Sequence, residues 1–409
     1  MKNQNYNILL NQTADFLEQI IRFPSTGGKE EELMQFMYKE FLPLADEVTL
    51  VPLSDDLLND PEYSTPIPDI SYNGRHNLRL KIKGTGQGKS LIFNAHSDVV
   101  PASSKDTDQF SPFRKDGCIY GRGACDDKGQ IATMYLLLKI IKESGIKLKG
   151  DVIFHIVVEE ENGGNGSLAA IKSGDRADAV IVLESSSFKI YSSVRGAVWF
   201  KVTCTGVAGH SGYSGKAISA LKNAIKVMEI FENYHKNLLA ASKGIPIFDN
   251  YENPMPITFG KLHSGDWPSA TPGLAVLEGV LGFLPNKKRA EIMKELEEEI
   301  IKYGGEQLKD RFKLEFMYKH EGHILDTSHP LVENLSQSIS KFDIIPQCDA
   351  MVASCDAWLY SEILGIPTIV FGPGDLKQAH TVDENIEIEQ IGKAAEILVD
   401  FLEKWCEKF

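Results

Sequence analysis

Histidine and acidic side chains follow each of four short apolar runs in the chain. The runs and the residues after them are 91–93 with His96 and Asp98, 152–158 with Glu159, Glu160 and Glu161, 179–183 with Glu184, and 366–371 with a loop that ends at His380. Any one of these side chains, taken alone, is more simply read as a solvated loop residue. Because the same relation recurs after all four runs, the pattern indicates one shared site.

The four runs predict strands of a single sheet. Each run is short and apolar on both faces, which is typical of a strand covered by helices on both sides. Helical periodicity lies between them over 130–144, and a further helical region is expected over 12–42 with a break at 23–32. This alternation favours an α/β fold with a mixed, mostly parallel sheet flanked by helices. Ligands of such sheets bind at the carboxyl ends of the strands, where the listed side chains would meet.

The donor types indicate a site for metal ions. Imidazoles and carboxylates without cysteine favour zinc, cobalt or manganese. Three carboxylates and two imidazoles exceed the needs of one ion and suit two ions about 3.5–4 Å apart that share a carboxylate. Asp126 is the candidate for the shared ligand, because Gly121, Gly123 and Gly129 let the backbone approach the site closely. The alternative is that Asp126 or Asp127 caps the helix that follows.

A different pattern fills residues 196–318. Four strands are expected, at 197–206, 257–265, 274–284 and 312–319, and two helices alternate with them in the order βαββαβ of a ferredoxin-like sandwich. The first of these helices is expected to bury one face, made of Ile218, Leu221, Ile225, Met228 and Phe231. Because the α/β pattern resumes at 366–371, we expect an inserted α+β domain at 196–318 within a catalytic domain of residues 1–195 and 319–409.

Charge and composition exclude several classes of partner. The chain has 57 acidic and 43 basic residues, and its formal net charge of −14 would repel a phosphate backbone, so no nucleic acid is expected. Neither a membrane span nor a signal peptide is recognisable, which predicts no membrane partner and a cytoplasmic location. The six cysteines form no C-x-x-C pair, which fits a reducing compartment and mostly buried thiols.

Six motifs carry a resemblance to a known family. They are NAHSDVVPA (94–102), YGRGACDDKG (120–129), EEENGG (159–164), VLESSS (182–187), AGHSG (208–212) and FGPGDLKQAHTVDENI (371–386). Together, and in this order, they resemble the M20 metallopeptidases, which include acetylornithine deacetylase, succinyl-diaminopimelate desuccinylase, aminoacylase and glutamate carboxypeptidase. The resemblance implies a zinc-exopeptidase-like catalytic domain and an inserted domain that acts as a lid and a dimerisation module.

The resemblance assigns metal ligands to five positions. His96 and Glu184 would bind one ion, Glu161 and His380 would bind the other, and Asp126 would bridge them. The cofactor would be two divalent ions, in the first place Zn²⁺, with Co²⁺ or Mn²⁺ as alternatives. The peptide bond after the bridging aspartate is commonly cis in the family, so a cis bond is expected between residues 126 and 127.

Two further acids would act beside the ligands. Asp98 would fix the tautomer of His96, and Glu160 would be the general base that takes a proton from water and passes it to the leaving amine. In the family, two glutamates are followed by one residue and a glycine, a spacing that residues 160–163 satisfy and that leaves Glu159 without a role. A register one residue earlier, with Glu159 as the base and Glu160 as the ligand, stays open at this point.

Histidines outside this set are interpreted in two ways. His210 matches a family histidine that reaches an active site, often across a dimer interface, to bind the substrate carbonyl or the oxyanion, so a homodimer through the lid domain is expected. A second group lacks the H-E-x-x-H spacing and is interpreted as a linker that returns to the first domain; it comprises His320, His323 and His329.

The expected substrate is a small amide. Glutamate at position 184 resembles the deacylases and carboxypeptidases of the family, which favours hydrolysis of an N-acyl amino acid or a related amide. The lid lacks the arginine that many such enzymes use to bind a substrate carboxylate, and Arg195 or a lysine could replace it. The alternatives are a dipeptidase or carboxypeptidase with the same site and, from another class, an inactive homologue that serves as a binding protein. The inactive homologue would have lost a ligand or the base, and neither is missing.

Overall fold

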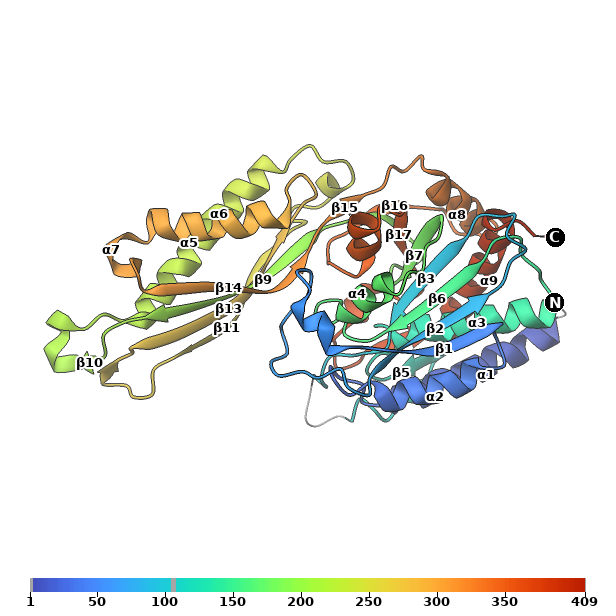
Figure 1. The fold of residues 1–409 in the computed structure, drawn as a ribbon, viewed down its shortest axis with the longest axis horizontal. Helices are drawn as coiled ribbons and strands as arrows, with labels where there is room; N and C mark the ends of the chain where they lie inside the picture. Colours follow the sequence, from blue (N-terminus) through green and yellow to red (C-terminus); the bar gives the residue numbers. More distant parts are fainter. Residues whose placement is uncertain (1–2, 104–107, 409) are drawn as a thin grey trace.

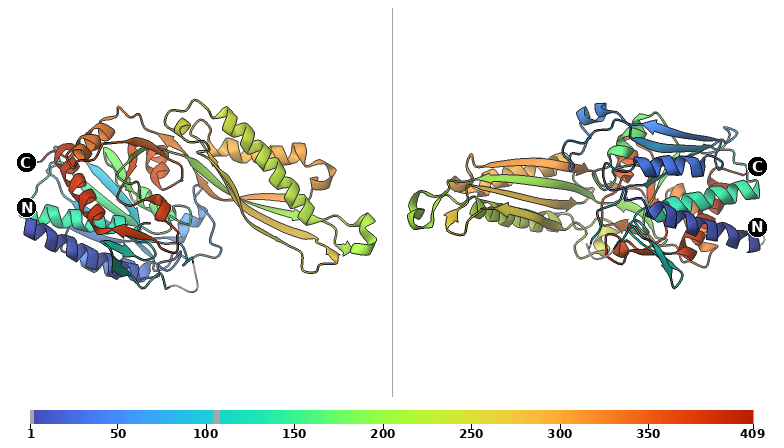
Figure 2. Two further views of the ribbon diagram at one scale, coloured as in Figure 1. Left: turned by 180° about the vertical axis from the view of Figure 1, so that it is seen from behind. Right: turned by 90° about the horizontal axis from the view of Figure 1, so that it is seen from below.

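The molecule has a larger and a smaller part. The computed structural model describes residues 3–103 and 108–408. Both chain ends lie at the side of the larger part that is remote from the smaller part, which projects as an elongated arm (Figures 1 and 2). Within the described ranges, every helix is too short or too polar to serve as a membrane span.

A nine-stranded sheet forms the centre of the larger part. Its order is β1-β2-β6-β3-β7-β17-β8-β15, and β16 also pairs with β8. The strands are β1 (Glu47–Pro52), β2 (His76–Ile82), β3 (Leu91–His96), β6 (Val152–Val157), β7 (Ala179–Leu183), β8 (Ile190–Val194), β15 (His323–Ile324), β16 (Cys348–Met351) and β17 (Thr368–Phe371). The central strands β6, β3, β7 and β17 are mutually parallel, whereas β1, β2 and β15 pair antiparallel. The predicted mixed, mostly parallel sheet is confirmed.

Helices cover both faces of this sheet. In Figure 1, α4 (Asn165–Lys172) lies in front of it, whereas α3 (Lys128–Ser144) and α9 (Ile388–Trp405) lie in front when the molecule is seen from behind (Figure 2). As a result, every residue of β3, β6, β7 and β17 is buried. The other helices of this part are α1 (Asn3–Ile21), α2 (Glu31–Phe41) and α8 (Pro330–Ser340).

An antiparallel sheet of order β11-β13-β9-β14 forms the arm. Its elements in chain order are β9 (Gly196–Thr205), α5 (Ala220–Ala241), β11 (Ile257–Ser264), β13 (Leu274–Phe283), α6 (Arg289–Tyr303), α7 (Gly305–Leu308) and β14 (Phe312–His320). This confirms the ferredoxin-like arrangement. The predicted buried face of α5 is wrong in detail, because Ile225 is 44% exposed. The buried face begins with Ala220, Ala224 and Val227, whose small side chains let the helix lie close to the sheet, and it includes Phe231 as predicted.

Short elements complete the chain. They are a three-stranded sheet of β4 (Phe113–Lys115), β5 (Cys118–Tyr120) and β18 (Asn385–Glu387), a pair of β10 (Gly209–His210) and β12 (Ala270–Thr271), and the short helical segments η1 (Asp55–Asn59), η2 (Ser211–Lys216), η3 (Phe248–Asn250), η4 (Leu359–Ile363) and η5 (Leu376–Gln378).

The buried apolar residues form two separate hydrophobic cores. One draws on 9–194 and 331–406, and the other on 198–308 with Ala350. All six cysteines are free, and four of them are buried.

Candidate metal centre

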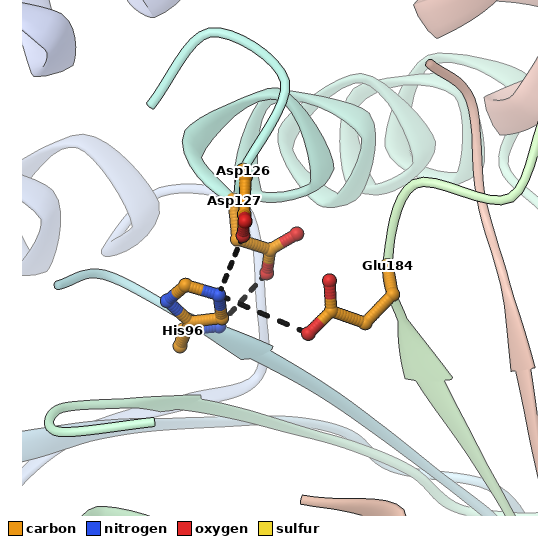
Figure 3. A group of neighbouring side chains, drawn as sticks. All are labelled: His96, Asp126, Asp127 and Glu184. Atoms are coloured by element: carbon orange, nitrogen blue, oxygen red, sulfur yellow. Dashed lines mark hydrogen bonds and ion pairs between the residues drawn. The ribbon is translucent and has the colours of Figure 1, made fainter. Parts of the chain in front are cut away.

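Three elements bring the first group of predicted ligands together. His96 is the last residue of β3, Glu184 directly follows β7, and Asp126 and Asp127 precede α3 (Figure 3). The Nε2 atom of His96 lies 3.0 Å from Oδ1 of Asp126 and 3.8 Å from Oε1 of Glu184. One donor atom from each of the four residues lies within 4.8 Å of the others, and all four residues are buried. The three predicted ligands among them, His96, Asp126 and Glu184, could hold one cation.

A second group shares Asp126 with the first. Nε2 of His380 lies 2.8 Å from Oε1 of Glu161 and 3.3 Å from Oδ2 of Asp126. The two carboxylates raise the pKa of His380 to about 10. The two oxygens of Asp126 thus face different groups, since Oδ1 approaches His96 and Oδ2 approaches His380. This is the placement required of a carboxylate that bridges two ions.

The charge of the two groups fits bound cations. Burial raises the pKa of Glu161 and of Glu184, and neighbouring carboxylates raise both further. In the described part of the chain, no lysine or arginine forms an ion pair with Asp126, Glu161 or Glu184. Buried carboxylates are normally paired or coordinate metals. The donor set, carboxylates with imidazole and without thiolate, is the one expected for zinc, cobalt or manganese.

Asp127 binds the backbone next to the candidate ligands. The bond between Asp126 and Asp127 is cis, as predicted. Asp127 occupies the N-cap position of α3, but its side chain makes no capping hydrogen bond there, so the capping alternative is wrong. Its Oδ2 atom instead accepts a hydrogen bond of 2.9 Å from the backbone N–H of His96. The contact joins the end of β3 to the start of α3.

Asp98 has a broader role than the sequence indicated. Nδ1 of His96 lies 2.9 Å from the backbone carbonyl oxygen of Asp98 and 3.4 Å from its carboxylate oxygen Oδ1. The two carboxylate oxygens accept hydrogen bonds of 3.1 Å from the backbone N–H groups of Glu160 and Glu161. Asp98 therefore orients the imidazole mainly through its main chain, while its side chain fixes the turn that carries the candidate base.

The three consecutive glutamates separate into distinct environments. Glu159 is fully buried, pairs with Arg75 and accepts hydrogen bonds from the Tyr72 hydroxyl at 2.7 Å and Asn165 Nδ2 at 3.1 Å. Those contacts leave it no free oxygen for a metal. Glu160 is 8% exposed, and burial raises its pKa, as do the nearby carboxylates of Asp356 and Glu184. This geometry favours the register with Glu160 as the base over the earlier one.

Two residues that the sequence did not single out organise the loop before α3. Oε1 of Glu384 accepts hydrogen bonds from the backbone N–H groups of Gly123 at 2.9 Å and of Cys125 and Asp126 at 3.1 Å. Its other oxygen pairs with Arg122, and both side chains are completely buried. Glu384 lies only four residues after His380. Both residues belong to motifs that are recognisable in the sequence. Glu384 lies in the motif 371–386, and Arg122 lies between the first two glycines of the motif 120–129.

The other histidines singled out from the sequence are not among the donors of this centre. His210 is exposed, in β10 at the far end of the arm (Figure 1), where its Nδ1 accepts a hydrogen bond of 3.1 Å from Gly212 N–H. The chain therefore does not bring its own His210 to the candidate metal ligands. The linker interpretation of the second group is wrong for His320, which ends β14, and for His323, which begins β15. His329 caps α8 through Nδ1.

Acidification is expected to destabilise the fold through His320 and His323. Burial lowers their pKa values to about 3 and about 4. An unfolded histidine has a pKa of about 6.5, so between about pH 4 and 6.5 the unfolded chain binds protons that the folded chain does not, and stability falls as pH falls. Each ring should remove on the order of 2 kcal/mol by about pH 5. As the pH is lowered to about 5, urea unfolding of the metal-free protein should show a smaller loss of stability for His323→Leu than for the unaltered chain. Equal losses of stability in the two proteins would contradict this prediction.

Comparisons with known proteins agree with the motifs. The model of peptidase family M20/M25/M40 matches residues 92–404. N-formyl-4-amino-5-aminomethyl-2-methylpyrimidine deformylase of Bacillus subtilis (strain 168) is 30% identical over 390 residues, which cover 86% of this chain and 88% of the relative.

More distant relatives extend the comparison. A probable succinyl-diaminopimelate desuccinylase of Staphylococcus epidermidis (strain ATCC 35984 / DSM 28319 / BCRC 17069 / CCUG 31568 / BM 3577 / RP62A) is 25% identical over 392 residues, which cover 88% of this chain and 94% of the relative. A solved dipeptidase structure from Saccharomyces cerevisiae has a TM-score of 0.80 at 13% identity, covering 99% of this chain and 98% of that one, which shows a common fold. Because the family model spans most of its length, the chain belongs to peptidase family M20/M25/M40.

Proposed function

We propose that this protein hydrolyses the amide bond of a small N-acyl compound with two divalent ions as cofactors. His96 and Glu184 would hold one ion, Glu161 and His380 the other, and Asp126 both. The observation that carries the proposal is the shared aspartate, whose two oxygens face two separate groups of donors. When bound, the ions would acidify a water molecule and polarise the amide carbonyl. Zn²⁺ is the first candidate, and Co²⁺ or Mn²⁺ would suit the same donors.

Glu160 would carry the proton in this reaction. Its side chain is buried, His96, Glu184 and Glu161 are among the charged groups that act on it, and its backbone N–H donates to Asp98. A carboxylate there can take a proton from the attacking water and deliver it to the nitrogen of the leaving amine. Burial and the neighbouring acids raise its pKa, which brings a carboxylate closer to the working range of a general base.

The names of the relatives suggest which classes of amide substrate to test first. The B. subtilis relative is named as a deformylase of an aminopyrimidine, which makes the formamide of a ring-bearing amine the first substrate class to test. An N-acyl amino acid is the second class, and Arg195 favours it. Arg195 has no acidic partner in the described residues and donates only to the carbonyl oxygens of Val352 and Gly196. Its positive charge, which no carboxylate neutralises among those residues, could bind a substrate carboxylate.

A hydrolysis screen tests the proposed function. The metal-loaded protein should cleave one of a set of N-formyl, N-acetyl and N-succinyl compounds, and exhaustive chelation should abolish the activity. Cleavage of dipeptides alone would favour the alternative of a dipeptidase or carboxypeptidase. Activity that survives chelation would contradict the metal-dependent reaction, and a protein that binds metal but cleaves nothing would favour the inactive homologue.

The arm is proposed to complete the site of a second copy. We take residues 196–318 as a lid and dimerisation domain and residues 1–195 and 319–409 as the catalytic domain, in a cytoplasmic homodimer. His210 belongs to β10, which lies at the tip of the arm (Figure 1). From there it could bind the carbonyl oxygen of a substrate in the partner.

Replacing His210 with alanine should lower the turnover number at least a hundredfold and leave the metal content intact, since oxyanion donors are typically worth about 10²–10³ in turnover. Mixing inactive His210→Ala protein with inactive Glu160→Gln protein should restore activity, because one site of each mixed dimer would have both residues. Near-normal turnover of His210→Ala would contradict its role. Full inactivity of the mixture would contradict its action across the dimer.

A further inference from the structure

A series of neighbouring aromatic rings lies where β9 and β14 join the larger part (Figure 1). Trp199 of β9 stacks on Tyr318 of β14, with ring centroids 4.9 Å apart, and Tyr318 stacks on His320 at 3.8 Å. His320 in turn lies 5.2 Å from Trp358, which directly precedes η4 in the larger part. Tyr318, His320 and Trp358 are buried. The series therefore connects the base of the arm with the larger part through packed rings.

A bulge in β14 sets the position of Tyr318. Tyr318 pairs with Trp199, whereas the register between β14 and β9 skips Met317. Such bulges bend a strand and redirect its side chains, and they are frequent beside active sites. The carbonyl oxygen of Met317 accepts a hydrogen bond of 2.7 Å from the backbone N–H of Thr65, in the larger part. This end of the arm is therefore fixed through its main chain as well as through the rings.

The turn that carries Glu160 and Glu161 packs against this ring series. Its backbone closes through a hydrogen bond of 2.9 Å from the N–H of Gly163 to the carbonyl oxygen of Glu160. Gly163 has a φ angle of 111°, which favours glycine. A Cβ added at Gly163 would lie 3.3 Å from a ring carbon of Tyr318 and 2.2 Å from Cβ of Ser64. Gly163 is thus packed closely against both residues, with no room for a side chain of its own.

Further contacts hold the ring of Tyr318 beside this turn. Its hydroxyl forms a hydrogen bond of 2.9 Å with Oγ of Ser354, in the larger part. Burial raises the pKa of Tyr318 well above its usual value, and Glu160 raises it further, more than any other charged group does. The next ring meets the next residue of the turn, because a Cβ added at Gly164 would lie 3.4 Å from Nε2 of His320. Two successive residues of the turn are thus in contact with rings that the arm provides.

We propose that Tyr318 is a positioning residue for the catalytic turn. Its stacked ring fixes Gly163, and thereby the stretch of backbone from which the candidate base Glu160 and the candidate ligand Glu161 project. The inference rests on the proposed function for the roles of these two glutamates. It gives the arm a part in the site of its own chain, in addition to the expected contribution of His210 to a partner.

Hydrogen exchange of the metal-free protein tests this contact. Tyr318→Met removes the ring but leaves a side chain that adapts to the space. The amides of residues 160–164 should then exchange at least tenfold faster, while those of α9 should stay within about twofold of the unaltered protein. Tyr318→Phe keeps the ring and should restore slow exchange. Equal acceleration in the turn and in α9 would show a general loss of stability and would overturn the positioning role.

A milder variant keeps the inference testable if Tyr318→Met does not fold. Trp199 is only partly buried, and Trp199→Leu removes the ring on which Tyr318 stacks. Exchange at 160–164 should rise at least threefold in this variant, again without a change in α9. Unchanged exchange in a folded Trp199→Leu protein and in Tyr318→Phe alike would overturn the role of the ring series.

Tyr251→Met is the matched control. Tyr251 also belongs to the arm, and its hydroxyl also crosses to the larger part, where it donates to the carbonyl oxygen of Ala350 at 3.2 Å. It is not among the atoms that crowd Gly163 or Gly164. Exchange at 160–164 should therefore stay normal. Acceleration equal to that in Tyr318→Met would show that the loss of any contact between the two parts loosens the turn, and would overturn the specific role of Tyr318.

Zinc binding and kinetics give two further measurements. Titration of metal-free Tyr318→Met with Zn²⁺ against a chromophoric chelator should show one of two ions bound at least tenfold more weakly, because Glu161 lies in the loosened turn. With the amide that the hydrolysis screen identifies, and at saturating Zn²⁺, kcat should fall at least tenfold while KM stays within about threefold. Tyr318→Phe should recover both values. A raised KM with unchanged kcat would show a contact with substrate and would overturn the positioning role.

The exchange measurement separates this inference from the proposed function. If the unaltered protein cleaves no amide, the proposed function is wrong, whereas faster exchange at 160–164 in Tyr318→Met would still support the positioning of the turn. If an amide is cleaved but exchange at 160–164 is the same in both proteins, the proposed function stands and the role of Tyr318 is overturned.

Discussion

Replacing Glu160 with glutamine should lower the turnover number by about 10²–10⁴-fold, the usual contribution of a general base. Glutamine has nearly the same shape, so the turn that Asp98 holds through two backbone N–H groups should persist. The amide cannot accept the proton of the attacking water. Steady-state kinetics should therefore show a loss in turnover, and metal analysis of the same preparation should show an unchanged content of ions.

The adjacent Glu159→Gln variant is the matched control. Glu159 pairs with buried Arg75 and does not face the ligand groups, so its loss should affect folding more than chemistry. Removing one partner of a buried ion pair typically costs about 3–5 kcal/mol of stability. We expect a lowered unfolding midpoint and, at a temperature where the variant is folded, nearly normal turnover. The opposite outcome, with Glu159→Gln inactive and Glu160→Gln active, would support the earlier register.

Replacing Glu384 with alanine should remove metal ions from the centre, although Glu384 is not a ligand. Its carboxylate accepts hydrogen bonds from three backbone N–H groups in the loop that ends at Asp126. It also neutralises Arg122, whose side chain is completely buried. The variant should lose about 3–5 kcal/mol of stability in the metal-free state, because a buried guanidinium is left unpaired. Elemental analysis after dialysis should show fewer than the full complement of ions.

A double variant separates these two effects. Arg122→Met combined with Glu384→Ala removes the unpaired charge, so most of the lost stability should return. The N–H groups of Gly123, Cys125 and Asp126 would still lack their acceptor, so the metal content should remain low. A stable double variant with full metal content would show that Glu384 does not position Asp126.

The sequence by itself was sufficient to predict both sheets and the meeting of the candidate ligands at one sheet edge. Apolar runs of strand length identify buried strands, and the next residues in the chain must lie at the same edge of a parallel sheet. His96 and Glu184 could therefore be placed together from sequence, although they lie on different strands. The sheet of the arm was recognisable because a change of periodicity from that of buried strands to that of half-exposed ones is a local property.

Other features depended on contacts between distant segments. Hydrophobic periodicity predicted that Ile225 of α5 is buried, but Ile225 is exposed and the neighbouring Ala224 is buried. The two residues are adjacent in sequence, and the position of the sheet against the helix decides which of them is covered. The support of Asp126 by Glu384 joins segments 258 residues apart, and no local pattern records such a pairing.

The different environments of the three consecutive glutamates also depend on contacts between distant segments. They are chemically identical, and only the positions of Arg75 and Tyr72 show that Glu159 is already paired. Spacing along the chain determines which side chains can meet at a strand end. The environment that gives each one its charge and orientation is a property of the tertiary structure, since a buried carboxylate is controlled by the groups packed around it.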